Sequence, residues 1–448
     1  MNNRNIKINK LILNNFKNVK NGAINFDTNV IGVYGQNGSG KTALVDACKF
    51  LKIILSGGLL PPDTYNYISV FEDTANITVD FDVKIQEKEY MVSYFVALTK
   101  EENKAIISKE KLSYKPKDSE KWEKKKDIVD YDITYSNLLK PKVKFKNIFA
   151  KEENIINLKV EQRICKESGK SFIFNDRTRD IALNQSLSEI STEIISSLTY
   201  FARCNLFVIS NENNGLISIN SILPVQFRKE ENNQIISGGM GIGITGPQLV
   251  SKETFDLLKT ILQPMNTVLG QLVPDLQLKV FDYGEELGSN GALYRKVELT
   301  SVKGDKVIPI RYESAGIKKI ISILSALISM YNNPSVCLII DELDAGIFEF
   351  LLGELLETIS SSGKGQLLFT SHNLRPLEML GKDSFYITTT NESNRYIKFI
   401  SVKEHNNLRD LYIRSINLGG QKEEVYKETD QFEIQRAFRL AGGEHDRD

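Results

Sequence analysis

The sequence predicts an α/β fold built on a mixed sheet, and three observations support this expectation. A glycine-rich loop at residues 35–42 separates a short apolar run, residues 30–34, from residues 43–51, whose apolar positions repeat at helical spacing. A second apolar run at residues 335–340 ends in two adjacent carboxylates. Residues 76–99 alternate apolar and polar side chains around a short turn, which is typical of an antiparallel hairpin. We therefore expect a mixed sheet around the loop with an antiparallel β subdomain beside it.

Composition places the chain in a broad class. At 448 residues it can bury one large core or two to three smaller ones, and its 57 basic and 57 acidic residues give a formal net charge of zero. No global basic field therefore draws it to nucleic acid, although a local basic groove is compatible with these numbers. The four cysteines are scattered without a C-x-x-C pair, so we expect neither a disulfide framework nor a zinc site. With neither a secretory leader nor an apolar run of membrane-spanning length in view, a cytoplasmic protein with no membrane partner is expected.

The glycine-rich loop is the strongest motif in the chain. Residues Gly35-Gln36-Asn37-Gly38-Ser39-Gly40-Lys41-Thr42 fit the phosphate-binding pattern G-x-x-x-x-G-K-[ST] without a mismatch. The glycines allow backbone N–H groups to surround phosphate oxygens, and the following helix N-terminus adds partial positive charge. Lys41 should reach the β and γ phosphates, and Thr42 should hold Mg²⁺. The loop predicts binding of a nucleoside triphosphate.

The segments between the motifs are assigned from alternation and from breakers. We expect strands at residues 6–13, 22–26 and 292–311, helices within 178–208 and at 253–269, and a mobile polar loop at 211–247. The lysine-rich residues 104–126 predict a solvated strand-and-loop surface, with a contact to a phosphate backbone as the alternative. Residues 241–246 formally read G-x-G-x-x-G, but no clear strand precedes them and no helix follows, so we do not interpret them as a dinucleotide site.

The acidic strand supplies the catalytic candidates. Because open α/β sheets bind ligands at the carboxyl ends of their strands, Asp341 is expected to hold Mg²⁺ and Glu342 to take the proton from an attacking water. Another apolar run, residues 365–371, ends at His372, which is expected to sense the γ-phosphate and orient the water. A simple strand-end turn is the alternative interpretation of the two carboxylates.

A third motif lies between these two. Ser314 is a good N-cap for a helix whose apolar positions continue to Ile328, and a capped helix N-terminus can bind an anion. Gly316 follows within the first turn. An ordinary helix cap without a ligand is the alternative here.

Taken in order, these motifs resemble the heads of ABC-type ATPases in the RecF, SMC and Rad50 branch, the AAA_15/AAA_21-like proteins, and their relatives among bacterial phage-defence ATPases. The stretch from Leu11 to Lys17 looks like the same branch. The resemblance implies an ABC-ATPase head that binds ATP and Mg²⁺, in which Ser314 and Gly316 contact the γ-phosphate of ATP bound on a second subunit. Asp344 occupies the position where the family's dimer-contacting loop begins. The usual Leu-Ser-Gly-Gly-Gln signature reads Glu-Ser-Ala-Gly-Ile here.

Spacing along the chain suggests a division into three parts. We expect an N-terminal ATPase lobe at residues 1–100, an inserted arm or lid at 101–290, and a C-terminal lobe at 291–448. The resemblance implies an ATPase that dimerises head-to-head around ATP and acts as sensor and scaffold for a separate toxin or nuclease in bacterial anti-phage defence. The ATPase subunits of PARIS-, Septu- and retron-type systems look like this in architecture. The alternative is a RecF-like DNA-binding ATPase of repair or recombination, and nucleic acid therefore stays open as a partner.

Overall fold

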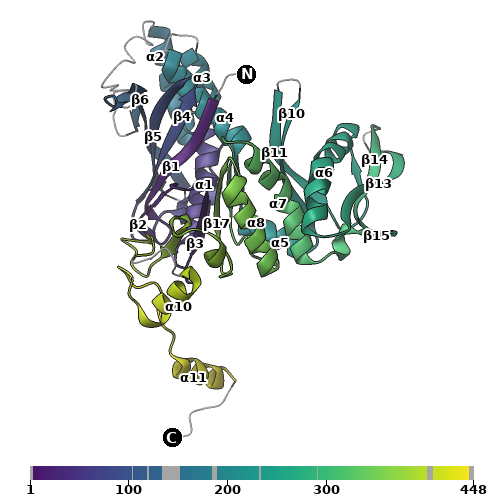
Figure 1. Ribbon diagram of the computed structural model, residues 1–448. Coiled ribbons are helices and arrows are strands. Elements are labelled where there is room, and N and C mark those ends of the chain that lie inside the picture. Colours follow the sequence, from purple (N-terminus) through teal and green to yellow (C-terminus); the bar gives the residue numbers. More distant parts are fainter. Residues whose placement is uncertain are drawn as a thin grey trace.

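The computed structural model describes residues 4–102, 104–118, 121–133, 152–183, 189–231, 234–289, 291–400 and 407–442. Within these ranges, two large sheets, a smaller four-stranded sheet and a two-stranded hairpin are connected by helices (Figure 1). None of the described helices combines the length and the apolar character needed to cross a bilayer.

The central sheet carries the phosphate loop and the acidic strand. Its order is β19-β18-β3-β17-β16-β9, and every neighbouring pair is parallel except β18 with β19. Its strands are short and buried, as expected for a sheet covered on both faces. Their bounds are β3 Val30–Tyr34, β9 Leu206–Ile209, β16 Cys337–Ile340, β17 Gln366–Thr370, β18 Phe385–Thr388 and β19 Tyr396–Ile397.

An antiparallel sheet packs beside it through helix α1 (Lys41–Leu55), whose apolar residues share one buried cluster with both sheets. The hairpin expected at residues 76–99 is confirmed as β4 paired with β5. The sheet has the order β2-β1-β4-β5-β6-β7, with β8 also pairing with β6. The bounds are β1 Arg4–Phe16, β2 Val19–Asn25, β4 Thr74–Ile85, β5 Lys88–Glu101, β6 Lys104–Asp118, β7 Lys121–Trp122 and β8 Lys126–Asp132.

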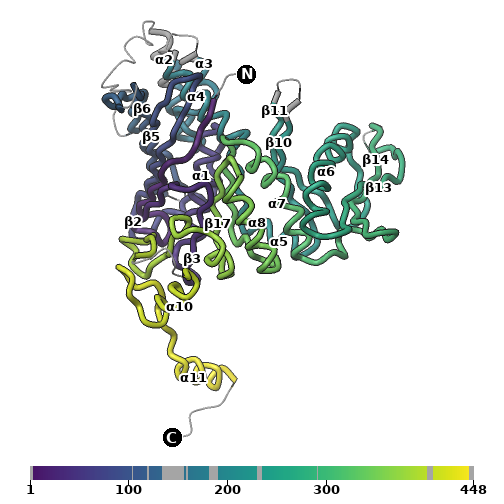
Figure 2. Tube along the Cα trace, viewed as in Figure 1, coloured from purple at the N-terminus to yellow at the C-terminus, as the bar shows by residue number. Residues whose placement is uncertain are grey.

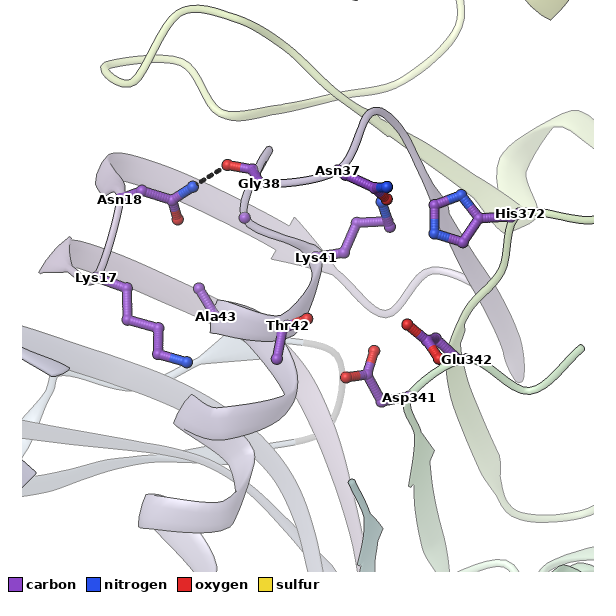
Figure 3. Close-up of a pocket in the computed structure, with 11 residues that line it drawn as sticks. Lys17, Asn18, Asn37, Gly38, Lys41, Thr42, Ala43, Asp341, Glu342 and His372 are labelled. Atoms are coloured by element: carbon purple, nitrogen blue, oxygen red, sulfur yellow. Dashed lines mark hydrogen bonds between the residues drawn. The ribbon is translucent and has the colours of Figure 1, made fainter. Parts of the chain in front are cut away.

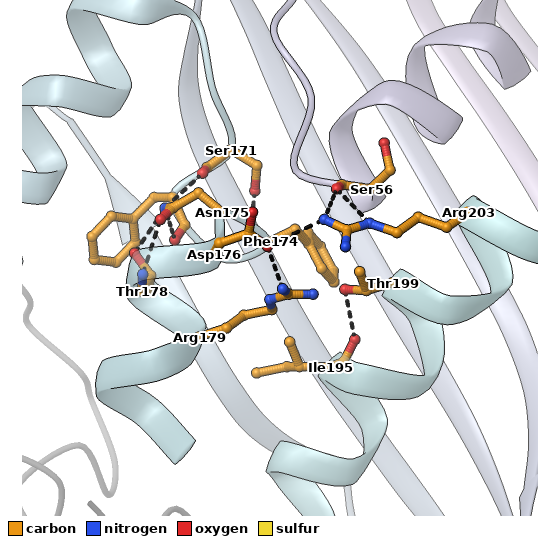
Figure 4. Close-up of polar contacts among 11 residues, drawn as sticks. Ser56, Ser171, Phe174, Asn175, Asp176, Thr178, Arg179, Ile195, Thr199 and Arg203 are labelled. Carbon is orange, nitrogen blue, oxygen red and sulfur yellow. Dashed lines mark hydrogen bonds and ion pairs between the residues drawn. The ribbon is translucent and has the colours of Figure 1, made fainter. Parts of the chain in front are cut away.

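A helical segment then covers this sheet and returns the chain to the central sheet. It comprises α2 Glu152–Ser168, α3 Asp176–Leu183, α4 Glu189–Tyr200 and the π-helix η3 Phe201–Asn205, which leads directly into β9. Buried Glu110 of β6 accepts hydrogen bonds from the hydroxyls of Tyr94 and Ser171, both at 2.6 Å. Arg203 donates to the carbonyl of Ser56 at the end of α1 (Figure 4). These bonds hold the segment against the body of the protein.

The described residues of the region expected as a mobile loop, 211–231 and 234–247, form a helix and a strand hairpin, so the expectation of a loop was wrong. Helix α5 (Asn211–Ser218) is followed by the hairpin of β10 (Ile222–Glu231) and β11 (Gln234–Gly243). The glycines hid the second strand, but its partner β10 alternates Leu223, Val225 and Phe227 as a buried face that packs with α7 (Ala315–Asn332). Gly241 to Gly243 end β11 and open no helix, so the dinucleotide pattern fails here as expected.

A small antiparallel sheet and five further α-helices complete the described part of the second half. The bounds are β12 Gln248–Val250, α6 Lys252–Leu272, β13 Leu276–Leu287, β14 Leu293–Lys303, β15 Lys306–Pro309, α8 Glu349–Ser362, α9 Pro376–Met379, α10 Leu408–Leu418 and α11 Gln431–Ala441, with short helical turns η1 Pro62–Tyr67, η4 Ile310–Tyr312 and η5 Lys382–Ser384. The helix and strands expected at 253–269 and 292–311 are confirmed. The C-terminal helix α11 projects away from the body, far from the N-terminus (Figure 2).

Strand pairing crosses both domain boundaries expected from the sequence. Strand β6 begins at Lys104 and pairs with β5, so the antiparallel sheet continues past residue 100. Strand β14 begins at Leu293 and pairs with β13 across residue 290. Strand β9, inside the range expected as an inserted arm, pairs with β16 in the central sheet. The middle of the chain is therefore interwoven with the two lobes.

Candidate nucleotide-binding site

The phosphate loop connects β3 to α1, as the sequence predicts. Gly35 must be glycine because its backbone has φ 152° and an added Cβ would lie 1.6 Å from the hydroxyl oxygen of Thr388. Gly40, the residue before α1, has φ 95°, a left-handed conformation that strains any residue with a side chain. Ser39 connects the loop to the end of β18, because its hydroxyl lies 2.5 Å from that of Thr388.

Lys41 lies inside the loop that it belongs to. Its ammonium group donates to the carbonyl oxygens of Gly35 at 2.6 Å and Gln36 at 3.0 Å, so the charge is held within the curve of the loop. Burial lowers the pKa of Lys41, while the nearby carboxylates of Asp341 and Glu342 act in the opposite direction. A triphosphate entering the loop would meet a cation that is already in place and poorly hydrated.

The acidic strand faces the loop across a pocket of about 270 Å³ (Figure 3). The structure brings together Lys41 and Thr42 on one wall with Asp341, Glu342 and His372 on the other, and Asn37, Gly38 and Gly40 also line it. The sequence predicted these residues from the phosphate loop, the acidic strand and the strand that ends at His372. The loop lies about three hundred positions before the other two motifs. Their convergence is the main structural support for the site.

Asp341 is arranged like a cation ligand. It is buried, its Oδ1 accepts a hydrogen bond from the Thr370 hydroxyl at 2.6 Å, and its Oδ2 is buried without a hydrogen-bond partner among the described residues. A buried carboxylate oxygen left unpaired is costly unless a cation binds it. Together with the hydroxyl of Thr42 in the same pocket, it forms the all-oxygen donor set that Mg²⁺ prefers. The residues therefore fit Mg²⁺.

Thr370 positions both carboxylates, a role that sequence reasoning missed. Besides donating to Asp341, its hydroxyl accepts the backbone N–H of Glu342 at 2.8 Å. Glu342 has φ 48°, an uncommon conformation for a residue other than glycine, and such strain is often found at functional sites. Thr370 lies at the end of β17 beside the acidic strand, so only knowledge of the sheet order could have identified it.

Asp344 orders the loop that carries His372. Its Oδ2 accepts the backbone N–H groups of His372 at 3.1 Å and Asn373 at 3.0 Å. Within this chain, the aspartate that the resemblance assigned to a dimer-contacting loop therefore fixes the histidine at the pocket rim.

The turn between β1 and β2 contributes two further residues that the sequence left without a role. Lys17 and Asn18 line the pocket, and the Asn18 amide donates to the carbonyl of Gly38 in the phosphate loop. Lys17 forms an ion pair with Asp46 of α1. The stretch ending at Lys17 was part of the resemblance, which is the one signal that could have pointed to this turn.

Ser314 and Gly316 lie elsewhere. Ser314 caps α7, accepting the backbone N–H of Ile317 at 3.2 Å, and is exposed; neither residue lines the pocket around Lys41. Gly316 packs so closely on the loop after β16 that an added Cβ would lie 1.9 Å from the carbonyl oxygen of Gly346. Buried Glu313, which replaces the usual leucine, accepts from the hydroxyl of Ser301 at 2.6 Å. The residues at positions 313 and 316 of this motif are therefore each explained by a contact within the same chain.

Lys319, one turn further along α7, is a buried lysine that the sequence did not single out. Its ammonium group donates to Asn214 at 2.5 Å. Burial lowers its pKa to about 8, and the carboxylates of Asp341, Glu342 and Asp344 oppose that shift without cancelling it. The buried charge therefore costs the folded state stability at neutral pH.

The pKa of Lys319 predicts a pH-dependent stability in the nucleotide-free protein. Below pH 8 the lysine is charged in both states, and between pH 8 and about 10.5 only the unfolded chain keeps the proton, so the free energy of unfolding rises with pH. We expect the parent to gain up to about 3 kcal/mol relative to Lys319→Met across this window. Denaturant unfolding of the parent and of Lys319→Met at pH 7.5 and pH 10 measures this difference in the free energy of unfolding. An equal change with pH in both proteins would contradict the prediction.

The fold and the site together define a nucleotide-binding protein of the P-loop type, with the phosphate loop and the acidic strand side by side on a largely parallel sheet. Residues 6–375 match the AAA_15 family, described as an AAA ATPase domain. The chain belongs to this family of ATPase domains.

Comparison with solved structures gives distant similarities. The chain is similar to an Smc head bound to the C-terminal winged-helix domain of ScpA (13% identity, 88% of this chain and 98% of that chain, TM-score 0.43). It is also similar to the Smc head with an extended coiled coil, bound to ScpA, from Pyrococcus furiosus (13%, 88% and 96%, 0.40) and to the SMC head of Thermotoga maritima (12%, 88% and 99%, 0.39). These TM-scores are below 0.5, so the likeness does not extend to activity or partners. A search of curated proteins found no significant match.

Proposed function

We propose that the protein hydrolyses ATP with Mg²⁺ in sites completed by a second copy of the chain. The supporting observation is that Ser314 lies at an exposed helix N-terminus outside the pocket that Lys41 lines. A helix N-terminus and its capping hydroxyl favour an anion. A head-to-head dimer would place each Ser314 over the γ-phosphate held by the partner's loop.

Each residue of the pocket then has a defined task. Lys41 and the loop N–H groups bind the β and γ phosphates, and Thr42 and Asp341 hold Mg²⁺, which when bound neutralises charge on the phosphates. Glu342, held by Thr370 in a strained backbone conformation, orients the attacking water and takes its proton. His372, whose backbone N–H donates to Asp344, lines the same pocket and has the task of sensing the γ-phosphate.

The surface around Ser314 supports a protein contact at this face. Tyr312 is 70% exposed and Phe348 is 68% exposed, at the turn before α7 and at the start of α8. Phe350 packs against Phe348 in a tilted arrangement with ring centroids 5.5 Å apart and is also exposed. Large aromatic side chains are enriched at protein interfaces. We assign this aromatic rim to the dimer interface.

Ser314→Arg tests the role of this face. The long charged side chain should block approach of the partner's γ-phosphate region, so steady-state ATP turnover should fall about a hundredfold while binding of ATP to the monomer is unchanged. Phosphate release and calorimetric titration measure the two quantities. Ser362→Arg is the control, because Ser362 lies exposed at the end of α8, whereas Ser325 of α7 is half-buried. Undiminished turnover in Ser314→Arg would contradict the assignment.

In the cell, we infer that the ATP-bound dimer acts as sensor and scaffold for a separate toxin or nuclease in anti-phage defence. The alternative is a RecF-like DNA-binding ATPase. The lysine-rich residues 104–126 do not favour it, because Lys111 pairs with Asp130 at 3.1 Å and Lys117 with Glu89 at 2.6 Å, so carboxylates offset the basic charge.

Co-purification separates these two roles. The Glu342→Gln protein, isolated from its host with ATP and Mg²⁺, should retain an effector protein that Lys41→Ala does not retain. Retention of duplex DNA in its place, lost on raising the salt concentration, would favour the repair role.

A further inference from the structure

Helix α11 presents an apolar face that no described part of the chain covers. Every residue from Gln431 to Ala441 is exposed, and α11 projects beyond α10 (Figure 1). Ile434, Ala437, Phe438 and Ala441 follow the spacing i, i+3, i+4, i+7 and share one side of the helix. Phe438 is 77% exposed. Because isolated helices this short are marginal in water, α11 needs a surface on which to pack.

The same chain carries an apolar groove of about 480 Å³ between α6, α7 and α8. It is lined mainly by aliphatic and aromatic side chains, among them Leu272, Ile328, Tyr331, Leu351 and Leu355. Grooves between helices are common docking sites for an amphipathic helix. The groove and the exposed face of α11 are both apolar, so their surfaces are chemically complementary.

The start of α11 is anchored beside the nucleotide site. The side-chain amide of Gln36, in the phosphate loop, donates to the carbonyl of Lys427 at 3.4 Å and accepts the Lys427 N–H at 3.1 Å. Nearby Val425 is buried. Only residues 428–430 separate this anchor from α11, a reach of about 11 Å. Helix α11 therefore departs from the phosphate-loop edge of its own protomer, on the side away from α6, α7 and α8 (Figures 1 and 2).

We propose that α11 of one protomer docks its apolar face into the groove of the second copy in the ATP-bound dimer. The proposal rests on the head-to-head arrangement proposed above, in which the phosphate-loop edge faces the partner's α7, one wall of that groove. Arg436 and Arg439 lie on the side of α11 away from the centre of the face formed by Ile434, Ala437, Phe438 and Ala441, so docking leaves both charges outside the groove. Each protomer would then hold the other by its C-terminal helix.

Substitution on α11 tests the proposal in the full-length Glu342→Gln protein with ATP and Mg²⁺. Phe438→Glu should weaken dimerisation about tenfold or more, measured by analytical ultracentrifugation, because it places a charge in an apolar groove. Phe432→Glu is the matched control, since Phe432 is 68% exposed on the opposite side of the same helix, and it should leave the dimer unchanged. Monomer binding of ATP should be unaffected in both.

A disulfide between copies gives a second measurement. In a Cys204→Ser background, a tagged copy with Phe438→Cys and an untagged copy with Leu355→Cys should cross-link only when ATP is present. If the dimer forms but Phe438→Glu does not weaken it, or the cross-link between Cys-substituted positions 438 and 355 is absent, the docking proposal is wrong and the dimer stands. If no ATP-dependent dimer forms, the proposed function and this inference both fail.

Discussion

Lys41→Ala is expected to bind ATP at least a hundredfold more weakly than the parent protein. The Lys41 ammonium group lies within the curve of the phosphate loop, where it donates to two loop carbonyls and can transfer these bonds to phosphate oxygens. Hydrogen bonds between charged groups contribute about 1.5–3 kcal/mol each, and loss of one or two accounts for the expected factor. Isothermal titration with ATP and Mg²⁺ measures the change.

The matched control for this substitution is Lys49→Ala. Lys49 lies on the same helix α1 and pairs with Glu212 at 3.0 Å, and it does not line the pocket. It should bind ATP like the parent. Parent-like affinity in Lys41→Ala would show that the loop does not hold the triphosphate.

Glu342→Gln is expected to bind ATP normally and to hydrolyse it about a hundred- to a thousandfold more slowly, because an amide keeps the shape of the side chain and cannot accept the proton of the water. The backbone bond from Glu342 N–H to Thr370 is retained, so the pocket geometry should persist. ATP that is bound but not cleaved should hold two copies together, and the variant should accumulate as a dimer or a larger assembly.

Phosphate release and light scattering after size-exclusion chromatography measure the two effects in Glu342→Gln. Glu357→Gln, an exposed carboxylate in the second half of α8 that lines neither the nucleotide pocket nor the apolar groove, serves as the control and should match the parent in both. Hydrolysis by Glu342→Gln at the parent rate would exclude Glu342 as the general base.

The parts of the site that the sequence predicted are those encoded by local order along the chain. A strand, a glycine-rich loop and a helix occur in sequence around Lys41, and an apolar strand leads directly into Asp341 and Glu342. Thr370 could not be assigned in this way, because its role depends on β17 lying beside β16. Asn18 was missed for the same reason: it reaches Gly38 only because the β1–β2 turn folds over the loop.

The parts of the fold that the sequence did not predict are governed by pairing between distant segments. Strand β9 has only four residues, and it is recognisable as a central strand only from its parallel pairing with β16. The β10–β11 hairpin was concealed by glycines in β11, although the buried alternation of β10 stabilises it against α7. In both cases tertiary packing outweighs local propensity.

Two residues of the Ser314 motif, one departure and one retained glycine, are also explained by tertiary contacts. Glu313 bonds to Ser301 and Lys303 of β14, and Gly316 accommodates the carbonyl of Gly346. Ser314 itself is exposed, and the proposed dimer would place it against the nucleotide of the second copy. The group that Ser314 contacts in the ATP-bound protein is therefore the critical test of the proposed mechanism.

Mixing two inactive variants tests the shared site most directly. Ser314→Arg and Glu342→Gln should each turn over ATP very slowly alone. In a mixed dimer, both substitutions fall in one site, and the other site combines intact Glu342 from one copy with intact Ser314 from the other. We predict that mixing them restores measurable phosphate release above the sum of the separate rates. If each site is complete within one chain, the mixture will be as inactive as its components.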